Sequence, residues 1–475
     1  MAIPAGEHRL LTSPAPAAAP LSLAPTNPST LQQKYYLGLD VGTTATKACA
    51  FSPDGEFLGV CEKGYQLRHP APGAAVQSPM DVLHAAEDAL TGLIEKMGRP
   101  PEAIGLSCPM HSLLLFDFEY EAILTDVITW ADTRAQAVMG DFTHEQCAAF
   151  HRVTGTPVHP MSPLVKLRWM LREQPELRET AGYCYDLKSF LTRYWTNTAV
   201  LDEQLASATG LYDAAAGEWY QPALKMAADG KFPFILPPVK PADHQLEWDE
   251  SIATRLGVTG VPLFLGGSDG VLANFGSGIL EPGEFALSVG TSAAVRTTHD
   301  RAKISSASGL FNYKFYGDRY VIGGASNNGG KVLEYWQNLL RADFGDVAAF
   351  IDGAMSVDAG DAPEFRPWLY GERAPVWDAS ATAELTGLRG HHSPNHLAAA
   401  VLHGVTDNIV TMIRQLEKAV GPAERIQVTG GITKSPEWLQ LLEKKSGRAV
   451  VKTSRERATG YGAALVAMGK LKELR

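Results

Sequence analysis

Apolar residues near the start of the chain come in short runs separated by turn-forming residues. The runs are joined by Val41-Gly42-Thr43-Thr44 and by Ser52-Pro53-Asp54-Gly55, in which Gly, Pro and Asp favour tight turns. This spacing predicts a meander of three strands, at residues 36–39, 47–51 and 57–60. Residues 79–97 then have a helical pattern, and residues 103–107 have the pattern of a buried strand.

The later part of the chain alternates between helical and strand patterns. Between the start signal Ser393-Pro394 and the stop signal Gly421-Pro422, one helical face carries Leu397, Val401, Val405, Ile409, Ile413, Leu416 and Val420. A strand at residues 426–429, the turn Gly430-Gly431 and a helix beginning at Ser435-Pro436 follow. Strands that alternate with helices predict an α/β protein.

One short pattern occurs twice, about 250 residues apart. Residues 37–44 form an apolar strand that enters a Gly-Thr-Thr turn, and residues 286–292 form an apolar strand that enters a Gly-Thr-Ser turn. This internal echo predicts two related domains joined near residues 276–282. We therefore expect one domain at residues 34–278 and a second at residues 279–475.

The first 33 residues differ from the rest, because Pro and Ala supply 13 of them and no helical or strand period is present. This composition predicts a flexible extension. Arg9 precedes a mildly apolar stretch of the kind found in targeting segments, but three prolines interrupt it, at positions 14, 16 and 20. A targeting role is therefore the less favoured interpretation.

Composition and charge narrow the classes of function. The 52 acidic and 42 basic side chains give a net charge of −10, which leaves too little basic surface for a general nucleic-acid binder. No apolar run reaches about 18 residues, so the sequence predicts no membrane partner. The five cysteines have no CxxC spacing, which favours a reducing, cytoplasmic location.

The repeated Gly-Thr turns suit phosphate binding, because Gly lets backbone N–H groups and hydroxyls approach phosphate oxygens closely. A single copy is equally typical of an ordinary hairpin, whereas one copy in each half favours a cleft that holds a polyphosphate from both sides. A Walker-type loop is absent, since Gly329-Gly330-Lys331 is followed by Val332 and lacks the required spacing.

Residues 263–270 end an apolar run in the turn Gly266-Gly267-Ser268-Asp269-Gly270. A carboxylate at the end of a strand is well placed as a general base or as a partner of Mg²⁺. The same turn matches the nucleophile elbow of serine hydrolases, with Ser268 as the nucleophile. That alternative leaves both Gly-Thr turns unexplained.

Two further clusters combine hydrogen-bonding groups with an apolar wall. They are the runs Pro109-Met110-His111-Ser112 and Trp130-Ala131-Asp132-Thr133-Arg134. A polyhydroxylated ligand needs such a mixture, because its hydroxyls require partners while its carbon face stacks. The alternative is that these His and Trp side chains belong to the core.

Together these motifs resemble the FGGY family of carbohydrate kinases, from Tyr35 to Leu474. The resemblance implies two ribonuclease H-like (actin-like) domains around a catalytic cleft, with ATP and Mg²⁺ as cofactors. It implies a catalytic base at Asp269 and a metal site at Asp40 and Asp269. Residues implied for ATP and phosphate binding are Gly42, Thr43, Thr44, Gly290, Thr291, Ser292, Gly330, Gly430, Gly431 and Ser435. Residues implied for substrate binding are Met110, His111, Trp130, Asp132, Arg134 and Asp269.

Within the family, four runs are similar to gluconate kinases, at residues 154–164, 206–211, 327–330 and 371–378. The similarity implies ATP-dependent phosphorylation of a sugar acid, D-gluconate at its 6-hydroxyl, with Arg134 as a candidate partner of the carboxylate. Xylulose kinases share the Met-His and Trp-x-Asp-x-Arg clusters, so a xylulose kinase, or another pentulose or polyol kinase of the family, is the alternative. A catalytically inactive sugar-acid sensor is a second alternative, which the intact Asp40, Thr43 and Asp269 disfavour.

The chain departs from the gluconate kinase pattern in three places. Ala293 stands where those kinases generally have Gly, His403 replaces an acidic or amide residue, and residues 1–33 have no counterpart. None of the three removes a catalytic group.

The resemblance implies small molecules as partners, namely a sugar acid and ATP. It leaves a homodimer open as the assembly.

Overall fold

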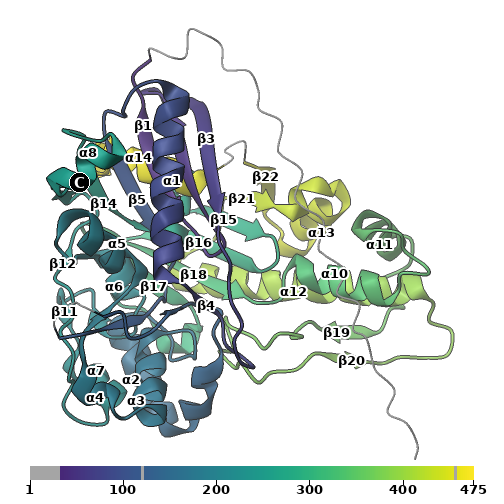
Figure 1. Cartoon of the computed structure of the whole chain (residues 1–475). Helices are drawn as coiled ribbons and strands as arrows, with labels where there is room; N and C mark the ends of the chain where they lie inside the picture. The colour runs from purple at the N-terminus through teal and green to yellow at the C-terminus, as the bar shows by residue number, and fades with distance from the viewer. Residues whose placement is uncertain (1–32, 119–121, 454–456, 475) are drawn as a thin grey trace, which may run out of the picture.

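The computed structural model describes residues 33–118, 122–453 and 457–474. The flexible extension predicted at residues 1–33 falls almost wholly outside this part of the chain. In Figure 1 two mixed sheets lie side by side, the first built mainly from the purple and teal part of the chain and the second from the green and yellow part.

The first sheet has the strand order β13-β14-β5-β1-β2-β3. Its antiparallel strands β1, β2 and β3 confirm the predicted meander, and β5 and β14 continue the sheet parallel to β1. The strands are β1 (Tyr36–Val41), β2 (Ala45–Phe51), β3 (Phe57–Gly64), β5 (Ile104–Cys108), β13 (Gln245–Leu246) and β14 (Leu263–Ser268).

The second sheet has the order β17-β18-β16-β15-β21-β22 and repeats the plan of the first. Strand β15 pairs antiparallel with β16 and parallel with β21, as β1 pairs with β2 and β5. The strands are β15 (Glu284–Val289), β16 (Ala293–His299), β17 (Phe311–Tyr316), β18 (Arg319–Ser326), β21 (Arg425–Gly430) and β22 (Ala449–Lys452). The repeated plan confirms the echo in the sequence, and the domain boundary at 278/279 stays a prediction.

Helices cover both sheets, and capping residues set their ends. Helix α1 (Pro79–Met97) begins where the Ser78 hydroxyl accepts the N–H of Asp81, and ends at Gly98 with φ of 70°. The other helices along the chain are α2 (His144–Thr154), α3 (Pro163–Glu173), α4 (Leu177–Thr180), α5 (Leu187–Thr196), α6 (Glu203–Ser207), α7 (Gln221–Ala228), α8 (Glu250–Leu256), α9 (Asp269–Gly276), α10 (Gly330–Leu339), α11 (Val347–Met355), α12 (Pro394–Val420), α13 (Pro436–Ser446) and α14 (Ala458–Ala467).

Short strands complete the fold outside the two large sheets. Most belong to the segment between β5 and β14, which has an apolar core of its own under α2, α3 and α7. They are β4 (Val76–Gln77), β6 (Leu114–Asp117), β7 (Val127–Ile128), β8 (Ala181–Tyr185), β9 (Leu201–Asp202), β10 (Tyr212–Asp213), β11 (Glu218–Trp219), β12 (Val239–Lys240), β19 (Glu364–Arg366) and β20 (Glu384–Thr386).

Helix α14 comes from the end of the chain, yet it packs against the first sheet, beside β1 and β5 (Figure 1). The contact depends on glycines, because a Cβ at Gly38 would lie 1.8 Å from the carbonyl oxygen of Gly460. A Cβ at Gly105 would lie 1.9 Å from the carbonyl oxygen of Ala463. Helix α14 thus connects the C-terminal end of the chain to the first sheet. The sequence pattern did not predict this contact.

We expect Gly38→Ala to destabilise the protein by about 1–3 kcal/mol, because the added methyl group forces α14 away from β1. Urea denaturation measures the loss. Gly59→Ala is the matched control, since the nearest atom to a Cβ at Gly59 is the flexible Lys96 Nζ at 3.7 Å. Equal stability of the two variants would contradict the close packing of α14.

Candidate active site

The two Gly-Thr turns connect equivalent strands of the two sheets. In the first turn the Thr43 hydroxyl accepts the indole N–H of Trp130 at 3.1 Å, and the Thr43 carbonyl accepts an N–H of Gln77 at 2.7 Å. In the second turn the Gly290 carbonyl accepts the N–H of Gly330 at 2.6 Å. Gly330 is the first residue of α10, so the start of this helix lies against the second turn, and its role in ATP binding stays a prediction.

Asp40 and Asp269 lie at one edge of the first sheet, because β1, β5 and β14 are parallel and end there. Asp269 begins α9, and its carboxylate accepts the N–H of Gly270 at 2.7 Å. Burial raises the pKa of Asp269. Burial, followed by the charge of Asp269, raises the pKa of Asp40 to about 7. The charge of Asp269 thus acts on Asp40, which lies at the same end of the strands.

Ser268 has a structural task in this turn. Its side chain is fully buried, and its hydroxyl accepts the N–H of Val271 at 3.3 Å, which caps α9. Its backbone N–H donates to Gln204 Oε1 at 2.9 Å. A nucleophile elbow presents an accessible hydroxyl, so this placement does not support the serine hydrolase alternative.

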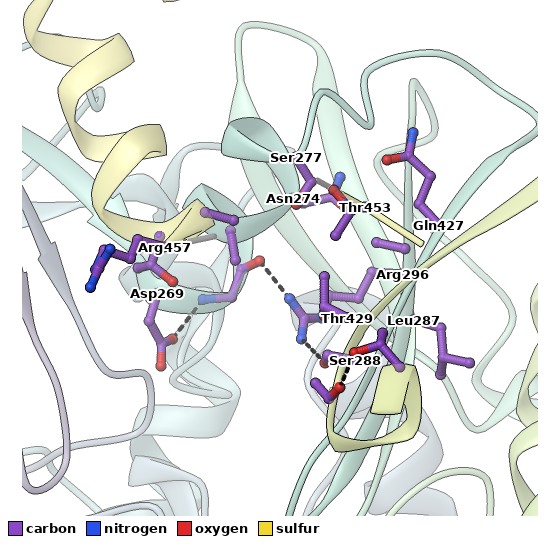
Figure 2. A pocket seen from close by; sticks show the side chains of 17 residues that line it. Asp269, Asn274, Ser277, Leu287, Ser288, Arg296, Gln427, Thr429, Thr453 and Arg457 are labelled. Carbon is purple, nitrogen blue, oxygen red and sulfur yellow. Dashed lines mark hydrogen bonds between the residues drawn. The ribbon is translucent and has the colours of Figure 1, made fainter. Parts of the chain in front are cut away.

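Two cavities meet at Asp269. The larger, of about 610 Å³, lies between α9, the start of α14 and the strands β15 and β21 (Figure 2). The smaller, of about 200 Å³, is lined by residues of both halves, including Met110, His111 and Trp130. Four residues line both cavities, namely Asp269, Gly270, Ser288 and Arg296. The two cavities therefore adjoin beside Asp269.

The structure brings most of the predicted substrate residues to the smaller cavity, but not Asp132 and Arg134. The Arg134 guanidinium donates to Asp132 Oδ2 from Nη2 at 2.7 Å and from Nε at 3.0 Å. Its carbon lies 4.6 Å from the ring centre of Trp169, and the residue lines a separate pocket. Asp132 also accepts the N–H of Ala75 at 3.0 Å. This pair supports the loop that carries Trp130.

Of the residues predicted for adenosine binding, Gly430 lines the larger cavity. Its φ of +87° requires glycine, and a Cβ there would lie 2.4 Å from the carbonyl oxygen of Val289. Gly431 and Ser435 lie beyond this lining, and the Ser435 hydroxyl accepts the N–H of Trp438 at 3.1 Å to cap α13. The glycine thus lets β21 end close against β15.

Arg296 and Arg373 are the site residues that the sequence analysis missed. Arg296 donates to the Gly270 carbonyl at 2.9 Å and to the Ser288 hydroxyl at 3.2 Å, so it links α9 to β15 (Figure 2). Burial lowers the pKa of Arg296, and the charge of Asp269 opposes that shift. Arg373 lines only the smaller cavity. Its run, residues 371–378, carried part of the resemblance, but no local pattern marked the arginine.

Two departures from the gluconate kinase pattern lie away from the cavities. Ala293 is buried in the core of the second sheet, while its neighbours Ser292 and Ala294 line the smaller cavity. Its methyl group therefore adds to the core and leaves the turn open. His403 lies on α12 in a surface groove that it shares with Asp407 and Lys445.

Two related α/β domains, each built on a six-stranded mixed sheet of the same plan, define the actin-like (ribonuclease H-like) fold of a two-domain kinase. The chain belongs to the FGGY family of carbohydrate kinases: the N-terminal domain of the family matches residues 35–276 and its C-terminal domain matches residues 285–470. The predicted fold class and family are confirmed. Enzymes of this family use ATP with Mg²⁺.

Relatives with known names fall into two groups. The chain is 33% identical over 430 residues to the gluconokinase of Bacillus subtilis (strain 168), covering 86% of this chain and 82% of that one. It is 25% identical over 445 residues to the xylulose kinase of the same organism, covering 91% and 88%. The crystal structure of gluconate kinase from Lactobacillus acidophilus superposes with a TM-score of 0.87 at 31% identity, covering 93% and 91%.

No helix in the described part of the chain combines the length and the apolar character that crossing a bilayer requires.

Proposed function

We propose that this kinase phosphorylates a sugar acid, D-gluconate at its 6-hydroxyl, and releases 6-phospho-D-gluconate and ADP. The observation that carries the proposal is the meeting of two cavities at Asp269, the larger suited to the nucleotide and the smaller to the carbohydrate. The gluconokinases among its relatives, at 33% and 32% identity, favour gluconate over other carbohydrates.

In this mechanism Asp269 accepts the proton of the attacking hydroxyl. Its raised pKa brings a carboxylate closer to the working pH, as general-base catalysis requires. Backbone N–H groups and hydroxyls of the two turns hold the transferring phosphoryl group in line and stabilise its charge. The residues with this task are Gly42, Thr43, Thr44, Gly290, Thr291, Ser292 and Gly330. Gly430, Gly431 and Ser435 complete the nucleotide site.

Asp40 and Asp269 fit a Mg²⁺ site. They are two carboxylates at one sheet edge, and the pKa of Asp40 is raised partly by repulsion from Asp269. A divalent cation would offset that repulsion, and oxygen ligands are those that Mg²⁺ prefers. When bound, Mg²⁺ supplies charge neutralisation at the phosphate oxygens.

The partners in this proposal are the sugar acid and ATP, and a homodimer stays a prediction. A cytoplasmic location is supported by the cysteines, since all five are free thiols.

The second candidate function is phosphorylation of a neutral ketose such as D-xylulose. It is favoured by a ligand-bound xylulose kinase from Lactobacillus acidophilus, which superposes with the same TM-score of 0.87.

We expect kcat/KM for D-gluconate to exceed that for D-xylulose by at least about 10²-fold. The reason is that a site built to pair a carboxylate leaves its cation unsatisfied when a neutral ketose binds. Coupled ADP release, measured with gluconate, xylulose, ribulose, glycerol and fuculose, tests the proposal. A preference for xylulose would replace gluconate with the second candidate and keep the kinase chemistry.

A further inference from the structure

The smaller cavity contains two arginines in different settings. Arg296 lines both cavities and is the arginine that acts on the pKa of Asp269. Arg373 lines the smaller cavity only, and its guanidinium carbon lies 5.6 Å from the ring centre of Trp130. A carbohydrate in the smaller cavity would therefore have its reacting end near Arg296. Arg373 would lie beside a different part of the same molecule.

Arg373 is a partly buried cation that forms no ion pair among the described residues. Its Nη2 donates to the Ser326 carbonyl at 3.2 Å, and its Nε is buried without a hydrogen-bond partner. Within the described residues, no carboxylate lies within 4.0 Å of its guanidinium nitrogens as an ion pair. Burial lowers the pKa of Arg373. A partly buried guanidinium with an unused donor is stabilised by an anion beside it, so this part of the cavity favours an anionic group.

The charge of the neighbouring Glu372 raises the pKa of Arg373 and partly opposes the effect of burial, but its carboxylate forms no ion pair with the guanidinium. Its carboxylate accepts the backbone N–H of Arg373 at 2.7 Å, the Ser326 hydroxyl at 2.8 Å and the Asn408 side-chain amide at 2.8 Å. These donors are all neutral. Glu372 is fully buried, and its oxygens are occupied in holding the loop that carries Arg373.

Three basic side chains lie near this end of the cavity, namely Lys166, His111 and His159. Lys166 is fully buried and donates to the carbonyls of His111 and Thr129 at 2.5 Å and 2.7 Å. Burial lowers the pKa values of His111 and His159 to about 3, so both rings are neutral. Each has one buried ring nitrogen without a partner, Nδ1 in His111 and Nε2 in His159. The surroundings of Arg373 therefore favour an anion.

The acids around the cavity are already engaged elsewhere. Asp132 is bonded to Arg134, and Asp378 accepts the hydroxyl and N–H of Ser380 at 2.6 Å and 2.8 Å. Asp269 lies at the junction with the larger cavity. None of these three carboxylates forms an ion pair with Arg373.

We propose that Arg373 binds the carboxylate of the substrate and thereby selects sugar acids over neutral sugars. This inference rests on the proposed function, since it assigns one end of the same substrate. The reacting hydroxyl lies at Asp269, and the carboxylate pairs with the guanidinium, including the free Nε. A planar guanidinium suits a carboxylate because it can donate two parallel hydrogen bonds.

The test compares D-gluconate with D-gluconamide, which keeps the hydroxyls and replaces the carboxylate with a neutral amide. For the native enzyme we expect kcat/KM to favour gluconate by about 10²-fold or more. In Arg373→Met we expect that ratio to fall to within about threefold, through a loss with gluconate and little change with gluconamide. Arg373→Gln keeps a donor for the Ser326 carbonyl, removes the charge, and should give the same result if the Met variant folds poorly.

Arg134→Met is the matched control, because Arg134 is an arginine bonded to Asp132 outside the cavity. We expect it to keep the native ratio. The role of Arg373 would be overturned if Arg373→Met and Arg373→Gln lost kcat/KM equally with gluconate and gluconamide. It would also be overturned if the gluconate-to-gluconamide ratio fell in Arg134→Met and not in the Arg373 variants. Neither outcome would affect the proposed function. A native enzyme that phosphorylates xylulose and not gluconate would overturn the proposed function, so the two failures are distinguishable.

Discussion

Asp269→Asn is expected to lower kcat by about 10²–10⁴-fold, which is the usual contribution of a positioned general base. Asn keeps the shape of the side chain and an oxygen to accept the N–H of Gly270, but it cannot take the proton of the attacking hydroxyl. We therefore expect the KM for the carbohydrate to change little. Coupled ADP release gives both constants, and the thermal midpoint shows whether the variant is folded.

The neighbouring Ser268 provides the control for this prediction. Ser268→Ala removes the hydroxyl that caps α9, so it should cost about 1 kcal/mol of stability while the variant keeps most of its turnover. A serine hydrolase would behave in the opposite way. Near-full activity of Asp269→Asn, or labelling of Ser268 by a fluorophosphonate, would contradict the kinase mechanism.

The elements with local signals were predictable from the sequence. Helix α1 has the predicted bounds, since Ser78 and Pro79 mark its start and Gly98 its end. The long helix α12 is likewise set by Ser393 and Gly421. Helix α14 had no such signal for its position, because glycine contacts between residues more than 350 apart in the chain place it on the first sheet. Such long-range packing leaves no period or cap in the local sequence.

In the candidate site, too, features formed by consecutive residues were predictable and contacts between distant residues were not. The turns at Gly42 and Gly290 and the strand that ends before Asp269 are formed by consecutive residues, so these turns were predictable from the sequence, while the roles of their residues stay predictions. Arg373 was missed because its neighbour in space, Trp130, is far away in the chain. Arg134 was expected at the substrate because it is near Trp130 in the sequence. Its closer neighbour Asp132 pairs with it instead, which a sequence motif does not reveal.

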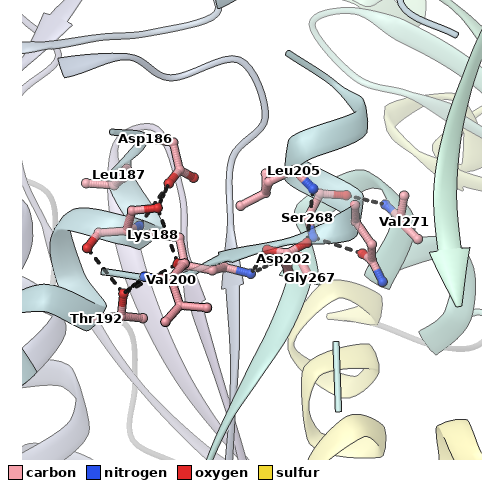
Figure 3. Close-up of polar contacts among 12 residues, drawn as sticks. Asp186, Leu187, Lys188, Thr192, Val200, Asp202, Leu205, Gly267, Ser268 and Val271 are labelled. Carbon is pink, nitrogen blue, oxygen red and sulfur yellow. Dashed lines mark hydrogen bonds and ion pairs between the residues drawn. The ribbon is translucent and has the colours of Figure 1, made fainter. Parts of the chain in front are cut away.

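The turn that carries Asp269 rests on a buried ion pair between Lys188 and Asp202 (Figure 3). Both side chains are fully buried, and the Lys188 ammonium donates to Asp202 at 2.5 Å and to the Gly267 carbonyl at 2.9 Å. We expect Lys188→Met to reduce the free energy of unfolding by about 3–5 kcal/mol, because it leaves the Asp202 charge buried and unpaired. Urea denaturation followed by fluorescence measures this loss.

Two control variants show whether the loss in the free energy of unfolding comes from the buried ion pair or would follow the replacement of any lysine. Lys34→Met removes an exposed lysine whose partner Glu102 is 3.7 Å away, and it should cost no more than about 1 kcal/mol. Combining Lys188→Met with Asp202→Asn removes both charges and keeps an oxygen to accept the N–H of Leu205, so the double variant should be more stable than Lys188→Met alone. If Lys188→Met and Lys34→Met were equally stable, the ion pair would not support the turn. Because Lys188 also holds the Gly267 carbonyl, two residues before Asp269, the destabilised variant should lose activity as well.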